Sequence, residues 1–178
     1  GKPIVVHTDL TISDANLNVM ENSYWESINT DPELFKSFNK LGLCSVVAGA
    51  TMMFNNEVKN LSFPVADKAP FFDHWIALKV VGKGVISSIH KPTMLYRQIG
   101  TNLAAVSIGK QNSFLYKIKN LKKVFKINYK EAVMLKSIGW GGYGKYLIFK
   151  IIVFYLCRYG PKYKSASFLF FSLIYNFL

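Results

Sequence analysis

The sequence predicts an α/β fold, and two observations lead to this prediction. In residues 1 to about 107, short apolar runs typical of strands alternate with segments of helical spacing, and turn signals separate them. Hydrophobic residues make up 51% of the 178-residue chain and charged residues 18%, a balance that favours a packed core over global disorder.

The first half of this region predicts two strands and a short helix. Pro3 to Asp9 is typical of a buried strand that ends in a carboxylate. Asp31 followed by Pro32 is a good helix start, because Asp caps the first turn and Pro suits the first helical position. A second, short strand is expected at about 51–54.

The second half predicts one helix and one strand. Apolar residues recur at helical spacing, which predicts a helix over about 71–81. Val85 to Ile89 predicts a short strand, and we expect the turn residues 90–92, His-Lys-Pro, to close it.

The rest of the chain divides into two segments. Residues 108–139 are rich in lysine, and four apolar residues at spacings of four, three and four predict a basic amphipathic helix: Phe114, Ile118, Leu121 and Phe125. Residues 140–178 form an aromatic, apolar tail of two expected helices, broken at Gly160-Pro161. Each apolar run is shorter than the roughly 20 residues that span a bilayer, so no transmembrane helix is expected.

The charge of the chain favours an anionic partner. Twenty-two Lys and Arg against ten Asp and Glu give a net charge of +12, which suits nucleic acid, acidic lipids or phosphorylated substrates. No zinc-finger spacing or aromatic RNA-binding pattern is present, so we expect no nucleic-acid partner. The two cysteines are far apart in sequence and are expected to be reduced thiols of a cytosolic protein.

Asp73 is the first candidate for chemistry. It lies at the front of the expected helix, among aromatic residues and beside His74. The helix dipole favours its ionised form, which can accept a proton from a hydroxyl, and nearby aromatic rings suit a sugar. The alternative is a capping aspartate above a packed aromatic cluster.

Three blocks resemble family 2 glycosyltransferases, particularly rhamnosyltransferase-like members. Residues 46–55, Val-Val-Ala-Gly-Ala-Thr-Met-Met-Phe-Asn, resemble the segment ahead of the acceptor site. Residues 72–78 resemble the His-Asp-Trp-Trp-x-Ala-Leu block, and residues 91–98 resemble the Pro-x-x-Leu-Tyr-Arg-Gln block that closes the catalytic domain. Residues 6–10, with Asp14 shortly after, resemble the strand that follows the metal-binding motif. The resemblance covers about residues 1–106.

The resemblance implies a partial GT-A fold over residues 1–107, and a reaction that moves a sugar from a nucleotide donor to an acceptor hydroxyl with inversion. The carboxylate of Asp73 would be the catalytic base. The other matched positions are His74 and Trp75 in the acceptor pocket, Gly49 and Thr51 at the junction of donor and acceptor, and Arg97 and Gln98 at the donor diphosphate. Gly49 would let substrate approach the backbone. A surface or structural ion pair is the alternative for Arg97.

Two features depart from the family pattern. Ile99 stands where the family often has His, so any phosphate or metal contact of that His is lost. The Asp-x-Asp motif that holds Mn²⁺ or Mg²⁺ in the full enzyme would precede Gly1, so we expect the metal's ligands outside this chain. Asp9 and Asp14 are not expected to replace them.

The sequence therefore predicts the acceptor-side part of an inverting glycosyltransferase of surface polysaccharide synthesis. The donor would be a nucleotide sugar, with rhamnose a candidate, and the acceptor a glycan or a lipid-linked sugar. The alternative is a truncated, non-catalytic binding module. We expect the basic and aromatic residues 113–178 to attach peripherally to the anionic, cytoplasmic face of the cell membrane; helices packed on the catalytic domain or a partner are the alternative.

Overall fold

A computed structural model describes residues 1–28, 30–43, 45–99 and 121–139 of the chain. The predicted tail at 140–178 and the first part of the predicted basic helix lie outside these residues. The described strands are β1 (Ile4–Ser13), β2 (Val19–Glu21), β3 (Met53–Phe54) and β4 (Val85–Arg97). The described helices are α1 (Tyr24–Ser27), η1 (Pro32–Phe35), α2 (Phe38–Leu43), η2 (Gly49–Thr51), α3 (Asn56–Ser62), α4 (Phe72–Val80) and α6 (Leu121–Ser137).

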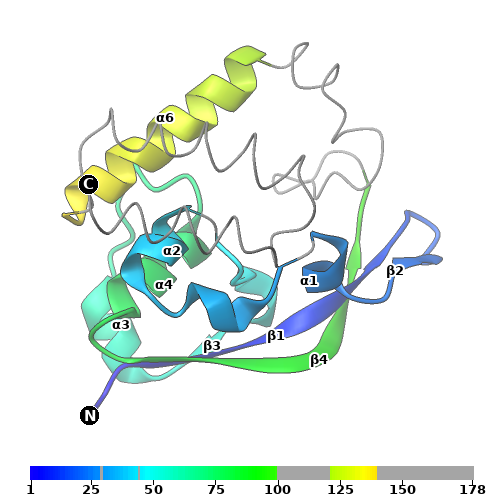
Figure 1. The fold of residues 1–178 in the computed structure, drawn as a ribbon, viewed down its shortest axis with the longest axis horizontal. Coiled ribbons are helices and arrows are strands. Elements are labelled where there is room, and N and C mark those ends of the chain that lie inside the picture. Colours follow the sequence, from blue (N-terminus) through cyan, green and yellow to red (C-terminus); the bar gives the residue numbers. More distant parts are fainter. Residues whose placement is uncertain (29, 44, 100–120, 140–178) are drawn as a thin grey trace.

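The sheet is mixed, and β1 is its central strand. β4 pairs with β1 in parallel along the full length of β1, from Ile4 opposite Val85 to Ser13 opposite Arg97. The other edge of β1 pairs antiparallel with β3 near its start and with β2 at its end. Figure 1 shows β1 and β4 running in the same direction, with a sharp bend in β4. The predicted α/β class is thus confirmed at the level of a mixed sheet with helices.

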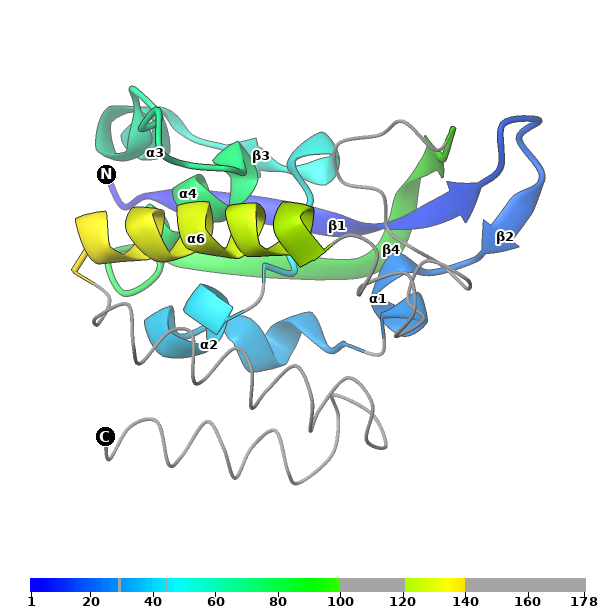
Figure 2. The ribbon, with the colours of Figure 1, turned by 90° about the horizontal axis from the view of Figure 1, so that it is seen from above.

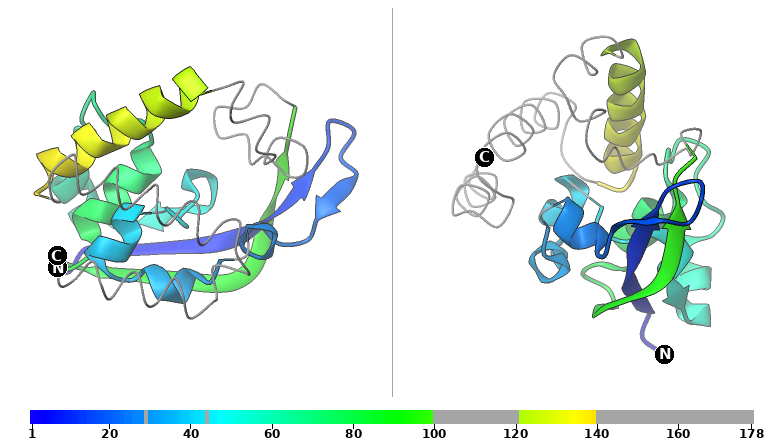
Figure 3. Two further views of the ribbon diagram at one scale, coloured as in Figure 1. Left: turned by 45° about the horizontal axis from the view of Figure 1, so that its top comes forward. Right: turned by 90° about the vertical axis from the view of Figure 1, so that its right-hand side faces the viewer.

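Helices α3 and α4 pack against the long strand pair, and α2 packs against α4. Figures 1 and 3 show α6 farther from the strands than α4. Seen from above, α6 lies along the direction of β1 (Figure 2). α4 is buried nearly all round, from His74 to Leu78 and at Val80, as expected of a helix packed between two layers.

The core joins all of these layers. Its residues come from β1, η1, α2, α3, α4 and α6, with Val5, Phe35, Leu41, Val58, Ile76 and Met134 among its members. α6 contributes Ala132, Met134 and Leu135, so the apolar side of the predicted basic helix packs on the domain in its described part. None of the helices in the described ranges combines the length and apolar character that a membrane crossing requires.

Several predicted elements are present. Asp31 caps η1 by accepting a hydrogen bond from the Glu33 amide, with Pro32 in the first turn. The helix predicted over about 71–81 is α4. The strand predicted from Pro3 extends beyond Asp9 to Ser13, and the strand predicted at 51–54 is reduced to its last two residues, after the short helix η2.

The turn predicted at 90–92 is wrong, because β4 continues through it to Arg97. Pairing with β1 persists on both sides of Pro92, which stands opposite Asp9 at an irregularity in the register. In the described residues β4 pairs only with β1 and is therefore an edge strand. A proline is tolerated on an edge strand or at a bulge, since its missing N–H breaks no internal ladder there.

Candidate active site

Asp73 lies in the first turn of α4 and is half-buried. Its Oδ1 accepts a hydrogen bond from the His74 amide at 2.7 Å, and its Oδ2 accepts one from the Gly49 amide at 2.9 Å. A carboxylate oxygen has two lone pairs, so each oxygen keeps one acceptor position for a further donor. The second of these bonds connects α4 to η2, which is far from it in sequence.

The Gly49 backbone is closely covered by an aromatic ring. A Cβ atom at this position would lie 2.3 Å from Cζ of Phe72 and 2.8 Å from its Cε2. A side chain at position 49 would therefore have to displace the Phe72 ring. The resemblance predicts that substrate approaches the backbone at Gly49, and in this structure the group that lies there is the Phe72 ring.

Thr51 fixes the end of η2 to the sheet. Its hydroxyl lies 2.8 Å from the carbonyl oxygen of Thr8, in the middle of β1, and 3.2 Å from that of Ala48. The structure thus brings Asp73, Gly49 and Thr51 together at one place beside the centre of β1.

His74 and Trp75 point into the core. His74 is 1% exposed; its Nε2 lies 2.8 Å from the Leu41 carbonyl oxygen, and its Nδ1 lies 3.7 Å from Oε1 of Glu131 in α6. The Trp75 indole donates to the Ser62 carbonyl at 2.8 Å. In this structure both side chains hold α4 in place from the inside, and neither offers the open face that an acceptor contact requires.

Arg97 and Gln98 lie further along the sheet. Arg97 stands opposite Ser13, and the Gln98 amide donates to the Ser13 carbonyl at 2.8 Å. Thr51 contacts Thr8, five residues earlier on β1; at about 3.3 Å per strand residue this separation is roughly 16 Å. Figures 1 and 2 show the end of β4 well away from α4. The structure does not bring this predicted diphosphate contact to Asp73.

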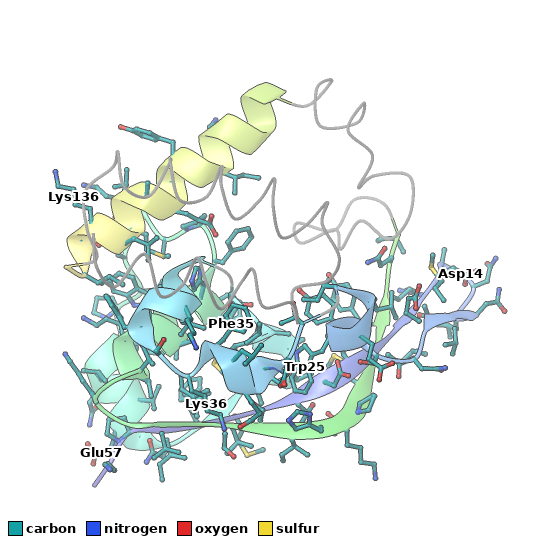
Figure 4. All side chains as sticks on the ribbon, in the orientation of Figure 1. Asp14, Trp25, Phe35, Lys36, Glu57 and Lys136 are labelled. Carbon is teal, nitrogen blue, oxygen red and sulfur yellow. The ribbon has the colours of Figure 1, made fainter. Side chains whose placement is uncertain are left out.

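The two carboxylates that follow the first strand serve local structure. Asp9 is 4% exposed; its Oδ1 accepts from the amides of Leu10 and Trp25, and its Oδ2 accepts from the Ser23 hydroxyl, so it anchors α1. Asp14 directly follows β1 in the hairpin that leads to β2 (Figure 4), and it is partly exposed. Hydrogen bonds from the side chain and amide of Asn18 lower the pKa of Asp14.

These carboxylates do not fit the divalent metal that the resemblance implies. No group of three or more His, Cys, Asp or Glu side chains gathers as a metal site among the residues described. The Asp9 carboxylate is already used by backbone and hydroxyl donors, and Asp14 closes its own turn.

The sequence analysis missed a buried histidine on β1. His7 is 1% exposed; its Nε2 lies 3.0 Å from the Ser88 hydroxyl, and its ring packs edge-on against Trp25 at 5.4 Å. Trp25 is the buried residue of α1, and its side chain reaches from that helix to β1 (Figure 4). Burial lowers the pKa of His7 to about 4. Strand alternation could have shown this, because Val5, His7 and Asp9 share one face of β1 and are all buried.

Comparisons with protein-family models, with curated proteins and with solved structures find no match for this chain. A functional assignment therefore depends on the resemblance of the three sequence blocks and on the geometry around Asp73.

Proposed function

We propose that this chain is the acceptor side of an inverting glycosyltransferase of the GT-A type, with Asp73 as its catalytic base. Asp73 takes the proton of an acceptor hydroxyl while that oxygen attacks the anomeric carbon of a nucleotide sugar. The bond from this carbon to the diphosphate breaks, and the nucleoside diphosphate leaves with the bonding electrons. The sugar is transferred with inverted configuration.

The observation that supports this proposal is the hydrogen bond from the Gly49 amide to Asp73 Oδ2. Gly49 belongs to the block at 46–55, and Asp73 belongs to the block at 72–78. The resemblance assigns the first block to the approach to the acceptor site and the second to the base. Two segments that are separate in the sequence are thus in direct contact where the proposal needs them.

The surroundings of Asp73 suit a base. It lies in the first turn of α4, where the backbone amides carry partial positive charge. The two backbone bonds fix the orientation of the carboxylate and leave acceptor positions for a hydroxyl. A base must lie within hydrogen-bond reach of the proton that it removes, and a fixed carboxylate at a half-exposed position meets this need.

The proposed partners are a nucleotide-sugar donor, with rhamnose a candidate sugar, and a glycan or lipid-linked acceptor of surface polysaccharide synthesis. The proposed location is the cytoplasmic face of the cell membrane, where an anionic surface attracts basic residues. Exposed lysines on α6, Lys126, Lys130 and Lys136, support this location.

A second candidate is a non-catalytic, glycosyltransferase-like binding module that associates with the membrane. The buried orientation of His74 and Trp75 favours it, as does the distance of Arg97 from Asp73. This candidate predicts sugar binding without transfer.

The proposed function is tested by Asp73→Asn in the chain and in any longer natural form that contains it. We measure the release of nucleoside diphosphate from a panel of nucleotide sugars, for the unsubstituted protein and for the variant. Mn²⁺ or Mg²⁺ and a lipid-linked acceptor are present in each assay. We expect turnover to fall by about 10²–10⁴-fold while donor binding persists, because the amide cannot take the proton. Asp67→Asn, the same change at an exposed loop position, is the matched control and should leave turnover unchanged.

Undiminished turnover in Asp73→Asn would exclude this residue as the base. Sugar binding by the unsubstituted protein with no turnover under any of these conditions would favour the non-catalytic candidate.

A further inference from the structure

An exposed aromatic ring lies beside the Asp73 carboxylate. Phe72 is the first residue of α4, and its side chain is 54% exposed. Its Cζ would touch a Cβ on Gly49, and the Gly49 amide binds Asp73 Oδ2. Given the covalent geometry of one residue, the ring carbon and the carboxylate oxygen are at most about 8 Å apart. One sugar ring with its hydroxyls can bridge this distance.

Both groups depend on the same residue for their positions. The Phe72 ring can lie over Gly49 only because this residue has no side chain, since the three atoms nearest to its would-be Cβ all belong to that ring. The Asp73 carboxylate is held by the amide of the same residue. Gly49 therefore sets the distance between an apolar surface and a hydrogen-bond acceptor.

Exposure of a single phenylalanine is not unusual in itself. Phe54 and Phe63 are also partly exposed, at 37% and 45%, but their rings pack against each other with centroids 6.0 Å apart. In the described part of the chain the Phe72 ring has no such aromatic partner. It has Gly49 beneath it and a carboxylate beside it.

We propose that Phe72 is the platform on which the acceptor sugar ring stacks while one of its hydroxyls donates to Asp73. The ligand class is a pyranose with a flat apolar face of axial hydrogens, because this face covers an aromatic ring while the hydroxyls point outward. In the block that resembles the family, this chain has Phe72 where the family has His, so the platform distinguishes this chain. The proposal rests on the proposed function, and it adds that Phe72 determines which acceptor sugar is bound.

Binding of a panel of methyl glycosides to the whole chain tests the platform, with calorimetry and saturation-transfer NMR as readouts. We expect Phe72→Ala to weaken binding of the preferred glycoside about tenfold, and Phe72→Trp to retain it, since stacking on an aromatic face gives a modest but measurable gain. Phe63→Ala removes an exposed ring elsewhere and is the matched control. Phe72→Leu keeps the apolar bulk without a ring face, so it decides the question if the alanine variant folds poorly.

A double-variant cycle tests the role of Gly49. Gly49→Ala should displace the exposed ring and weaken glycoside binding as much as Phe72→Ala does, with little change in the thermal midpoint because the ring is free to swing outward. In a Phe72→Ala background, Gly49→Ala should have no further effect on binding. Additive losses would contradict the shared geometry.

Failure of the platform and failure of the proposed function give different results. No glycoside binding by the unsubstituted chain at millimolar concentration, or binding by Phe72→Ala and Phe72→Leu as tight as that of the unsubstituted chain, would overturn the platform whatever the turnover shows. Binding that depends on Phe72, together with full turnover in Asp73→Asn, would keep the platform and remove the base.

Discussion

His7 places an ionisable ring in a buried position on β1. Its imidazole lies between the Ser88 hydroxyl and the edge of Trp25, and its Nδ1 has no hydrogen-bond partner among the residues that the structure describes. A neutral ring is tolerated there, but a charged ring would be poorly solvated. Burial therefore lowers the pKa of His7 from 6.5 to about 4.

This shift predicts that the fold loses stability in mild acid. The unfolded chain binds a proton at His7 below about pH 6.5, whereas the folded chain resists it until about pH 4. The unfolded state therefore binds more protons over this window, and the free energy of unfolding falls as the pH falls through it, by on the order of 3 kcal/mol in total. Urea unfolding at pH 7, 5.5 and 4.5 measures the effect.

A matched pair of variants isolates His7 from the other titrating groups. His7→Gln should flatten the pH dependence between 6.5 and 4 in the same urea series. His90→Gln, at a histidine whose side chain is 56% exposed, should leave the dependence in place. A full acid response in His7→Gln would assign it to other residues.

At the scale of the elements, the backbone approaches closely where β1 and β4 begin, at Pro3 and Gly84. A Cβ at this position would lie 2.1 Å from the Pro3 carbonyl oxygen, which also accepts the Val85 amide at 2.9 Å. The obstacle is backbone, so it cannot rotate away as a side chain can.

Gly84→Ala should therefore separate the two strands at this end. We expect a loss of about 2 kcal/mol in the free energy of unfolding, from overpacking and from a weakened Val85 bond. Chemical denaturation measures it. Lys83→Ala, at the exposed neighbouring position, should change stability by less than about 0.5 kcal/mol. An equal effect of the two substitutions would contradict the close contact at Gly84.

The elements that could be predicted from sequence are those specified by local signals. Asp31-Pro32 fixes the start of η1, and the apolar spacing of residues 72–80 fixes α4. β4 could not be delimited in this way, because the turn residues 90–92 are overruled by pairing with β1, a partner distant in the sequence. No local pattern indicates that β1 and β4 pair in parallel.

The candidate site was predictable to a similar degree. The place of Asp73 in the first turn of α4 follows from helical spacing. Its contact with Gly49 joins two of the sequence blocks that the resemblance places near the acceptor site. The directions of His74 and Trp75 depend on α2, α3 and α6, which contact α4 from the core side. Tertiary packing of this kind leaves no trace in the spacing of the residues around Asp73.

At the scale of the whole molecule, the net charge is +12, and part of the positive charge lies on the exposed side of α6. Ala132, Met134 and Leu135 face the core, while Lys126, Lys130 and Lys136 are exposed. In the described part of α6, the side that could contact a membrane surface therefore carries lysines, because the apolar side is packed on the core.

Replacing the three lysines by Gln should weaken binding to vesicles that contain anionic phosphatidylserine. Each lysine near such a surface contributes about 1 kcal/mol, so we expect a loss of roughly two orders of magnitude in vesicle partitioning, and the binding should also weaken as salt rises. Vesicle sedimentation measures both. The triple change Lys59→Gln, Lys68→Gln and Lys83→Gln removes the same charge from other exposed positions and serves as the control. Equal losses in the two triple variants would show a diffuse charge effect rather than a membrane-facing helix.

The parallel pairing of β1 with β4 has a consequence for the chain during its synthesis. β1 is completed before β4, its longest partner, which is finished only when Arg97 has been made. At about 5–20 residues per second, this strand leaves the ribosome with one edge unpaired for on the order of ten seconds. Throughout that interval the nascent chain depends on its early helices, or on chaperones, to keep a strand built for the centre of a sheet from joining a neighbouring polypeptide.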